Sequence, residues 1–315
     1  MAEIPKIAYV FPGQGSQKVG MGLDLHHAYS SAKEVFDEAD AALGFPLSRL
    51  CFAGPEEELT KTKNVQPALV ATSIACLRAA READNRDLPL PTFVAGHSLG
   101  EYTALVAANV LSLSDAVILT RERGRLMYEA GQSNPGGMLA VIGLAEKSVE
   151  NICRHSKTEI SNVNCPGQIV ISGAIDALAE ANKLAKTKGA RRLIPLKVSG
   201  AFHSALMDPI IAEFSEVISS FAFHPPTVPI IVNVAAQPLT NVESIKEELL
   251  KQLRSCIQWQ KSVEYMVNSG IATFYEIGPG SVLSGLIKRI NPELSTFNMS
   301  EVEDIIQLLH SNPLP

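Results

Sequence analysis

Short apolar runs alternate along the chain with longer segments of helical periodicity. The apolar runs have the length of strands and suit a sheet that is covered on both faces; they lie at residues 6–11, 93–95, 228–234 and 273–277. The segments with helical periodicity lie at residues 28–42, 56–59, 66–83, 101–113, 113–129, 207–221, 242–252, 262–269 and 282–290. Strands separated by helices in this way predict an α/β layer architecture.

The middle of the chain departs from this alternation. After the break at Asn134-Pro135-Gly136-Gly137, the expected order is strand, helix, strand, strand, helix, strand, at residues 138–144, 145–155, 159–164, 168–172, 175–188 and 190–197. The βαββαβ order is that of the ferredoxin-like split unit. We therefore expect a small domain of residues 131–198, inserted into a large domain formed by residues 1–130 and 199–315.

A G-x-S-x-G motif, Gly96-His97-Ser98-Leu99-Gly100, lies between an expected strand and an expected helix. This context is that of a nucleophile elbow, whose serine projects at the start of a helix. The free N–H groups and the positive dipole end of a helix favour a developing oxyanion there. The alternative is an ordinary glycine-rich turn with an N-capping serine. Neighbours in so tight a turn point apart, so we expect His97 to pack or to line the site.

The helix expected at residues 113–129 carries a charged residue on its inward stripe. Ala116, Thr120, Arg123 and Met127 recur at spacings of four, three and four. A buried guanidinium is costly without an anionic partner. That partner is either an internal Asp or Glu or the substrate, and periodicity alone leaves both open.

A serine nucleophile needs a base, and His203 stands in a glycine-flanked loop after an expected strand. Capping of the next helix is the alternative role for His203. No Asp or Glu occupies an obvious strand-end loop between Ser98 and His203, which allows a dyad oriented by a backbone carbonyl or an amide. In elbow enzymes the residue after the nucleophile, here Leu99, gives one oxyanion N–H. Gln14, in the loop after the first strand, offers the second N–H, unless this loop is only a polar turn.

Composition narrows the function classes. The chain has 315 residues, of which 46% are hydrophobic and 19% charged, as in a globular protein. A net charge of -6 argues against nucleic acid as the main ligand. Five scattered cysteines without a C-x-x-C indicate reduced thiols in a cytoplasmic protein, and no metal-binding motif is present. The apolar runs are far shorter than the ~20 residues of a membrane helix, so we expect no membrane contact.

Five basic residues and no acidic one occur between Lys183 and Arg192. Such a run is either a solvated face or a docking surface for an acidic partner.

Several motifs match one family, and in its order along nearly the whole chain. They are Phe11-Pro12-Gly13-Gln14-Gly15-Ser16-Gln17, Gly96-His97-Ser98-Leu99-Gly100-Glu101, Arg123-Gly124, Asn162-Val163-Asn164-Cys165-Pro166-Gly167-Gln168, Phe202-His203, Gln258-Trp259 and Gly278-Pro279-Gly280. On these motifs the sequence resembles the malonyl-CoA:acyl-carrier-protein transacylases of fatty-acid synthesis.

The resemblance implies an α/β-hydrolase-like large domain with an inserted ferredoxin-like small domain. The roles it implies are nucleophile for Ser98, general base and then acid for His203, ligand of the malonyl carboxylate for Arg123, oxyanion donors for Gln14 and Leu99, orientation of His203 through a backbone carbonyl for Gln258, cleft lining for Asn162 and Asn164, and rejection of branched acyl chains for Phe202.

The implied reaction moves a malonyl group from malonyl-CoA to Ser98, and then to the phosphopantetheine thiol of acyl carrier protein. The resemblance implies no cofactor, because coenzyme A is part of a substrate. We expect a monomer, and an acidic carrier protein that docks on the run Lys183–Arg192 or on Lys288-Arg289. The alternatives are a serine esterase or thioesterase, a non-enzymatic acyl-binding module, and an acyltransferase of a polyketide pathway.

Overall fold

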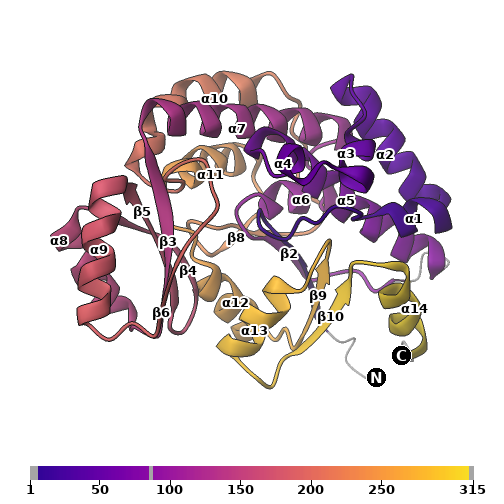
Figure 1. Cartoon of the computed structure of the whole chain (residues 1–315). Helices are drawn as coiled ribbons and strands as arrows, with labels where there is room; N and C mark the ends of the chain where they lie inside the picture. Colours follow the sequence, from indigo (N-terminus) through magenta and orange to yellow (C-terminus); the bar gives the residue numbers. More distant parts are fainter. Residues whose placement is uncertain (1–5, 85–87, 312–315) are drawn as a thin grey trace.

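The computed structural model describes residues 6–84 and 88–311, and it confirms the expected α/β architecture (Figure 1). Its larger sheet has the strand order β10-β9-β1-β2-β7-β8. All neighbours in this sheet pair in parallel, except the antiparallel pair of β7 and β8. The bounds are β1 Ile7–Phe11, β2 Phe93–Gly96, β7 Ile230–Ile231, β8 Pro238–Leu239, β9 Thr273–Ile277 and β10 Ser295–Met299.

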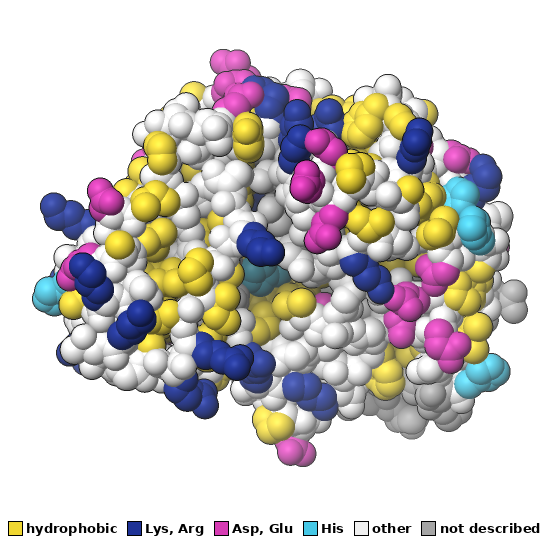
Figure 2. Space-filling model, in the orientation of Figure 1, with side chains coloured by type: hydrophobic (Ala, Val, Ile, Leu, Met, Phe, Trp, Pro, Cys, Tyr) yellow, Lys and Arg dark blue, Asp and Glu magenta, His cyan; other side chains and the backbone are white. Residues whose placement is uncertain are grey.

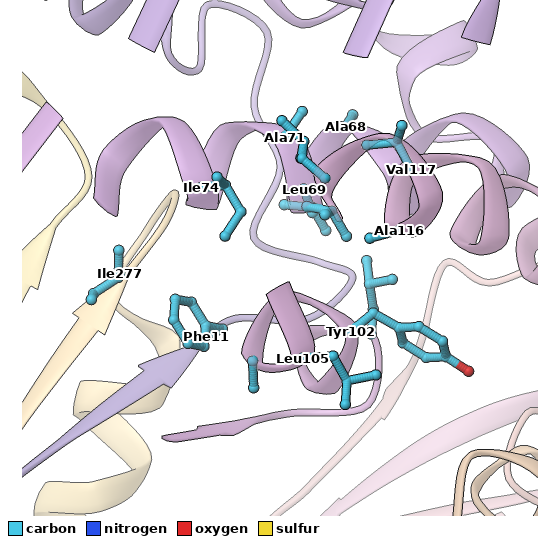
Figure 3. Close-up of a cluster of buried hydrophobic side chains, with 14 of the residues drawn as sticks. Phe11, Ala68, Leu69, Ala71, Ile74, Tyr102, Leu105, Ala116, Val117 and Ile277 are labelled. Atoms are coloured by element: carbon cyan, nitrogen blue, oxygen red, sulfur yellow. The ribbon is translucent and has the colours of Figure 1, made fainter. Parts of the chain in front are cut away.

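Helices cover both faces of the larger sheet. Along β1, Tyr9 and Phe11 belong to the hydrophobic core on one face, and Ala8 and Val10 to the core on the other. This alternation is the period of two that a strand imposes. Figure 3 shows Phe11 in the first core, below side chains from several helices. That face is covered by helices that include α2 Ser30–Leu43, α5 Thr62–Ala83, α6 Gly100–Ala107 and α7 Leu113–Ser133; the other is covered by α12 Trp259–Asn268 and α13 Val282–Ile290.

Two loops meet at the carboxyl edge of this sheet. β1 and β2 pair in register, with Phe11 opposite Gly96, so the segments after them lie side by side. The approach requires glycine, since a Cβ on Gly13 would lie 2.4 Å from the His97 carbonyl oxygen. A Cβ on Gly100 would lie 2.1 Å from the Phe11 carbonyl oxygen. The G-x-S-x-G turn is therefore fixed against the loop that carries Gln14.

A second, four-stranded sheet is formed by the middle of the chain, in the order β4-β5-β3-β6, with antiparallel neighbours. The elements follow as β3 Gly136–Ile142, α8 Glu146–Ser156, β4 Glu159–Cys165, β5 Gln168–Ala174, α9 Ile175–Thr187 and β6 Arg192–Pro195. Leu139 and Val141 of β3 pack with α8 and α9 in one core. Met138 and Ala140 alternate with them and line a cavity on the opposite face of the sheet.

Some elements differ from those expected. The run 228–234 forms only the two-residue strand β7, because the chain turns back after Val232, where the N–H of Ala236 donates to the Val232 carbonyl. The hydrophobic pattern missed α1 Leu23–Ala28, α3 Leu47–Ala53, α14 Val302–Ser311, β8 and β10. The remaining helical elements are α4 Glu56–Leu59, the 3-10 helix η1 Ala205–Ile210, α10 Ile211–Ser219 and α11 Val242–Arg254. Within the described residues, no helix is both long and apolar enough to cross a bilayer.

Candidate active site

Ser98 stands in a strained turn between β2 and α6. Its φ is 52°, in the left-handed region that non-glycine residues rarely adopt. A Cβ on Gly96 would lie 1.9 Å from the carbonyl carbon of Gly100, so the turn closes only with glycine there. Its strain, tightness and position before a helix are those of the nucleophile elbow that the sequence predicts.

His203 lies against this serine. Its Nε2 is 2.8 Å from Ser98 Oγ, although 105 residues separate the two in sequence. Its Nδ1 is 2.7 Å from the backbone carbonyl oxygen of Gln252. A carbonyl only accepts, so Nδ1 carries the proton and Nε2 presents its lone pair to the Ser98 hydroxyl. Burial, reinforced by the positive charge of Arg123, lowers the pKa of His203 from 6.5 to about 3. The imidazole is therefore a neutral base at physiological pH.

The family resemblance implied that the Gln258 carbonyl orients His203, and this expectation is wrong. The Gln258 carbonyl accepts the N–H of Ser262 at the start of α12, and the Gln258 N–H donates to Asn233. The carbonyl beside His203 belongs to Gln252, in the last turn of α11. Carbonyls of a last helical turn have no intrahelical partner. That rule was the available signal, because the helix expected at residues 242–252 ends at this glutamine.

Arg123 lies on the buried stripe of α7, and its side chain is held by amides. Its two terminal nitrogens donate to Gln66 Oε1 at 2.9 Å and to Gln252 Oε1 at 2.8 Å. The second nitrogen is also 3.4 Å from Ser98 Oγ. Among the described residues, no Asp or Glu forms an ion pair with Arg123, although it is only 1% exposed. Neutral partners leave its charge available to an anion beside Ser98.

A cavity of about 260 Å³ opens above the dyad, where Figure 2 shows the surface hollowed between the four-stranded sheet and the rest of the molecule. Nine of the ten site residues expected from the sequence line it; Gln258 does not. They are Gln14, His97, Ser98, Leu99, Arg123, Asn162, Asn164, Phe202 and His203. Its apolar wall contains Met127, Met138, Ala140, Val170, Leu196 and Val198. A cavity of this size, with polar groups around Ser98 and an apolar wall opposite, suits a small acyl group and the end of a thioester.

The two expected oxyanion donors lie on this cavity from opposite loops. Within the described part of the chain, no hydrogen bond occupies the backbone N–H of Gln14 or of Leu99. Both groups are therefore free to bind a carbonyl oxygen of an acyl group on Ser98.

The small sheet contributes the opposite wall. His97 Nε2 is 2.9 Å from Asn164 Oδ1, and the His97 ring packs edge-on against Trp259. Asn162 is 5% exposed and pairs as an isolated bridge with Ile257. His97 therefore does both things expected of it, because it packs and it lines the cavity.

Four supporting residues were given no role in the sequence analysis. Gln66 and Gln252 accept hydrogen bonds from Arg123. Asn233 accepts one from the backbone N–H of Ser98, and Glu101 accepts one from the side-chain amide of Gln252. All four are at most 1% exposed. A buried polar residue inside an apolar helix, such as Glu101 in α6, was the signal that could have revealed them. Among the described residues, no group of three or more His, Cys, Asp or Glu side chains is arranged to hold a metal.

Comparison with known proteins agrees with this geometry. The family model described as the acyl transferase domain matches residues 8–306. A malonyl CoA-acyl carrier protein transacylase of Bacillus subtilis is 46% identical over 305 residues, which are 95% of each chain. A protein of the same name from Staphylococcus aureus is 43% identical over 95% of this chain and 97% of its own.

Solved structures extend the likeness to the fold. An acyl carrier protein S-malonyltransferase from Vibrio cholerae superposes with a TM-score of 0.92 at 40% identity, over 96% of this chain and 99% of that one. A malonyl-transacylase solved in complex with a type II polyketide-synthase acyl-carrier protein gives a TM-score of 0.93 at 39% identity, over 98% of this chain and 100% of that one. The chain therefore belongs to the acyl transferase domain family, with the malonyl CoA-acyl carrier protein transacylases as relatives over almost its entire length.

Proposed function

We propose that this protein transfers malonyl groups from malonyl-CoA to the phosphopantetheine thiol of acyl carrier protein, and so supplies the extender unit of fatty-acid synthesis. The observation that carries the proposal is Arg123, which is buried, held by neutral amides and 3.4 Å from the hydroxyl of Ser98. A guanidinium in that position binds a carboxylate at the far end of a short acyl chain on the serine. Malonyl is such a chain.

The reaction has two half-reactions with balanced proton transfers. His203 Nε2 takes the Ser98 proton while Oγ attacks the malonyl thioester carbonyl, and the N–H groups of Gln14 and Leu99 stabilise the oxyanion. The C–S bond breaks, and the coenzyme A sulfur receives that proton. In the second half, His203 accepts the proton of the carrier thiol, whose sulfur attacks the ester. The C–O bond breaks, and Ser98 regains its proton. The reaction needs no cofactor.

A direct experiment tests this function. Purified protein is mixed with malonyl-CoA alone and analysed by mass spectrometry, and carrier protein is then added. We expect a malonyl adduct on Ser98 that disappears as malonyl-carrier protein forms. An adduct that releases malonate to water at the same rate with and without the carrier would instead identify a thioesterase.

The low pKa of His203 leads to a pH prediction. The neutral imidazole is the active form, so activity falls as pH decreases through the pKa of the folded protein. Because that pKa is lowered from 6.5 to about 3, the acidic limb of kcat/KM should lie below about pH 5. The measurement is kcat/KM for malonyl transfer between pH 4 and 8, in steps of about one pH unit. Circular dichroism at each pH confirms that the protein remains folded. An inflection near 6.5 in folded protein would contradict the lowered pKa.

We propose that the carrier protein docks at one rim of the cavity. Arg191 and Arg192, from one of the two expected runs, line a depression together with Arg289 from the other. Gln168 lines both this depression and the catalytic cavity. Positive charge beside the entrance suits an acidic carrier whose pantetheine arm must reach Ser98.

Reversal of that charge gives a second prediction. Arg289→Glu should raise KM for the carrier by about tenfold at low salt, with less effect at high salt, because rim charges act mainly on association. Acylation of Ser98 by malonyl-CoA should change less. Lys33→Glu, on α2, is the matched charge reversal, and its KM for the carrier should remain that of the wild type. Equal effects of both reversals would place docking elsewhere.

We further propose an α/β-hydrolase-like large domain of residues 1–130 and 199–315, with a ferredoxin-like small domain of residues 131–198. The element order and strand order of the small sheet support this division. A monomer in the cytoplasm is the proposed state, and five free cysteines support a reducing compartment.

A further inference from the structure

The strained turn at Ser98 is held from two sides by amide side chains. Its backbone N–H donates to Asn233 Oδ1 at 2.6 Å, and its carbonyl accepts from Gln252 Nε2 at 3.0 Å. Asn233 Nδ2 also donates to the Gly96 carbonyl at 2.6 Å, one residue before the motif's histidine. A serine at a φ of 52° persists only where its surroundings over-determine it. These amides supply that constraint.

Gln252 reaches three functional groups through different atoms. Its Nε2 bonds to the Ser98 carbonyl, its Oε1 to Arg123, and its backbone oxygen to His203. The residue is fully buried. The direction of this one amide therefore affects the nucleophile, the base and the guanidinium together.

A single carboxyl oxygen joins the two amide residues. Glu101 Oε2 accepts from Gln252 Nε2 at 3.0 Å and from the backbone N–H of Asn233 at 3.1 Å. Glu101 lies in the first turn of α6, three residues after Ser98, and is 1% exposed. Glu101 is not among the described residues that line the cavity, so it does not touch an acyl group there.

Three groups fix which way the Gln252 amide points, and the acceptor at position 101 is one of them. A buried amide can exchange its oxygen and nitrogen by a half-turn. On one side Gln252 faces Arg123, which only donates. On the other it faces two acceptors, the Ser98 carbonyl and the Glu101 carboxyl. Without the carboxyl, one of the three contacts that oppose the half-turn is lost. The half-turn would place an NH₂ group against the guanidinium.

An oxygen acceptor, more than a negative charge, is what this position requires. The charged groups that face Glu101 are Arg123 on α7 and Glu248 on α11. Burial and Glu248 together raise the pKa of Glu101 above its usual range. Glutamine, which keeps the oxygen and has no charge, is thus a suitable replacement.

We propose that Glu101 is a positioning residue, whose carboxyl oxygen fixes Gln252 and Asn233 and thereby holds Ser98, His203 and Arg123 in one arrangement. This role deepens the malonyl-transfer function proposed above and rests on it for the acyl-group readout. It predicts that two properties fail together when the acceptor is lost: the reactivity of Ser98 and the preference for a carboxylated acyl group.

The test compares Glu101→Ala with Glu101→Gln. Two quantities are measured in folded protein: the rate at which a fluorophosphonate labels Ser98, and the ratio of kcat/KM for malonyl-CoA to that for acetyl-CoA. In Glu101→Ala both should fall at least ~10-fold, the size of effect typical of lost preorganisation. Glu101→Gln should keep both within about threefold of wild type. Ile305→Ala, a buried substitution in α14 at the far side of the core, is the control for lost stability alone and should leave both unchanged.

Three results would overturn the proposal: both quantities retained in Glu101→Ala, equal losses in Glu101→Gln and Glu101→Ala, or the same losses in Ile305→Ala at equal melting temperature. If Glu101→Ala does not fold, Glu101→Asp carries the same expectation, because it withdraws the oxygen by one methylene while keeping the charge. If the wild-type protein reacts with fluorophosphonate but transfers no malonyl, the proposed function is rejected. The labelling rates of the Glu101 variants would then still test the positioning role of Glu101.

Discussion

Ser98→Ala should abolish the malonyl adduct and lower malonyl transfer by about four orders of magnitude or more. The substitution removes the only oxygen that His203 Nε2 contacts at 2.8 Å among the described residues, so no nucleophile remains for the base. Losses of this size are usual when the nucleophile of a serine–histidine pair is removed, and what remains comes from binding and the oxyanion donors. Alanine keeps the Cβ, so the turn retains its backbone strain and its amide contacts.

The measurement combines intact-protein mass spectrometry after malonyl-CoA addition with steady-state transfer to the carrier. His203→Ala is the companion variant, with an expected loss of roughly 10²- to 10⁴-fold, because Ser98 then lacks its base but keeps its position. A malonyl adduct of normal yield in Ser98→Ala, mapped to another peptide, would refute the assignment of the nucleophile.

Arg123→Ala should cripple malonyl transfer and spare acetyl transfer. An arginine–carboxylate pair in a buried site loses roughly 2–5 kcal/mol when one partner is removed, or about 30- to 5000-fold in kcat/KM. Acetyl has no carboxylate and loses none of this interaction. Arg123→Lys should fall between wild type and alanine, because an ammonium cannot form the two-pronged contact.

Arg121→Ala is the matched control for Arg123→Ala. It removes the same side chain from the same helix, but Arg121 bonds Asn64 at 3.2 Å and lies over the Phe45 ring, and it does not line the cavity. Its malonyl and acetyl rates should match those of wild type. If Arg123→Ala reduces both acyl groups equally, the guanidinium has a general role in the site and no carboxylate-binding role.

The comparison of sequence with structure shows which kinds of information are local. The inward position of Arg123 followed from helical periodicity, because all four residues of its stripe lie on one face of α7 and are buried. The serine followed from glycine spacing, since no larger residue fits at Gly96 or Gly100. The βαββαβ order of residues 131–198 followed from the alternation of short apolar runs with segments of helical periodicity.

What escaped depends on long-range packing. The carbonyl that orients His203 is 49 residues away in sequence, and its position depends on where α11 ends against the His203 loop. Gln258 is also a glutamine and belongs to a motif of the family. Its carbonyl, however, accepts the N–H of Ser262 at the start of α12 and does not reach His203. Strand β10 was missed because its sequence, STFNM, is too polar for the apolar pattern of a covered strand, and pairing with β9 alone makes it an edge.

The bridge between Asn162 and Ile257 constrains how this protein can be recombined with its relatives. The Val163 N–H donates to the Ile257 carbonyl, and the Ile257 N–H donates to the Ser161 carbonyl. These backbone hydrogen bonds form a seam between β4 and a segment about a hundred residues later in the chain. A chimaera that exchanges residues 131–198 alone would take one half of this seam from each parent. β4 also carries Asn164, whose Oδ1 lies 2.9 Å from His97 Nε2 on the facing wall of the cavity. Acyl specificity is therefore best transplanted with residues 255–258 included, so that both sides of the seam come from one parent.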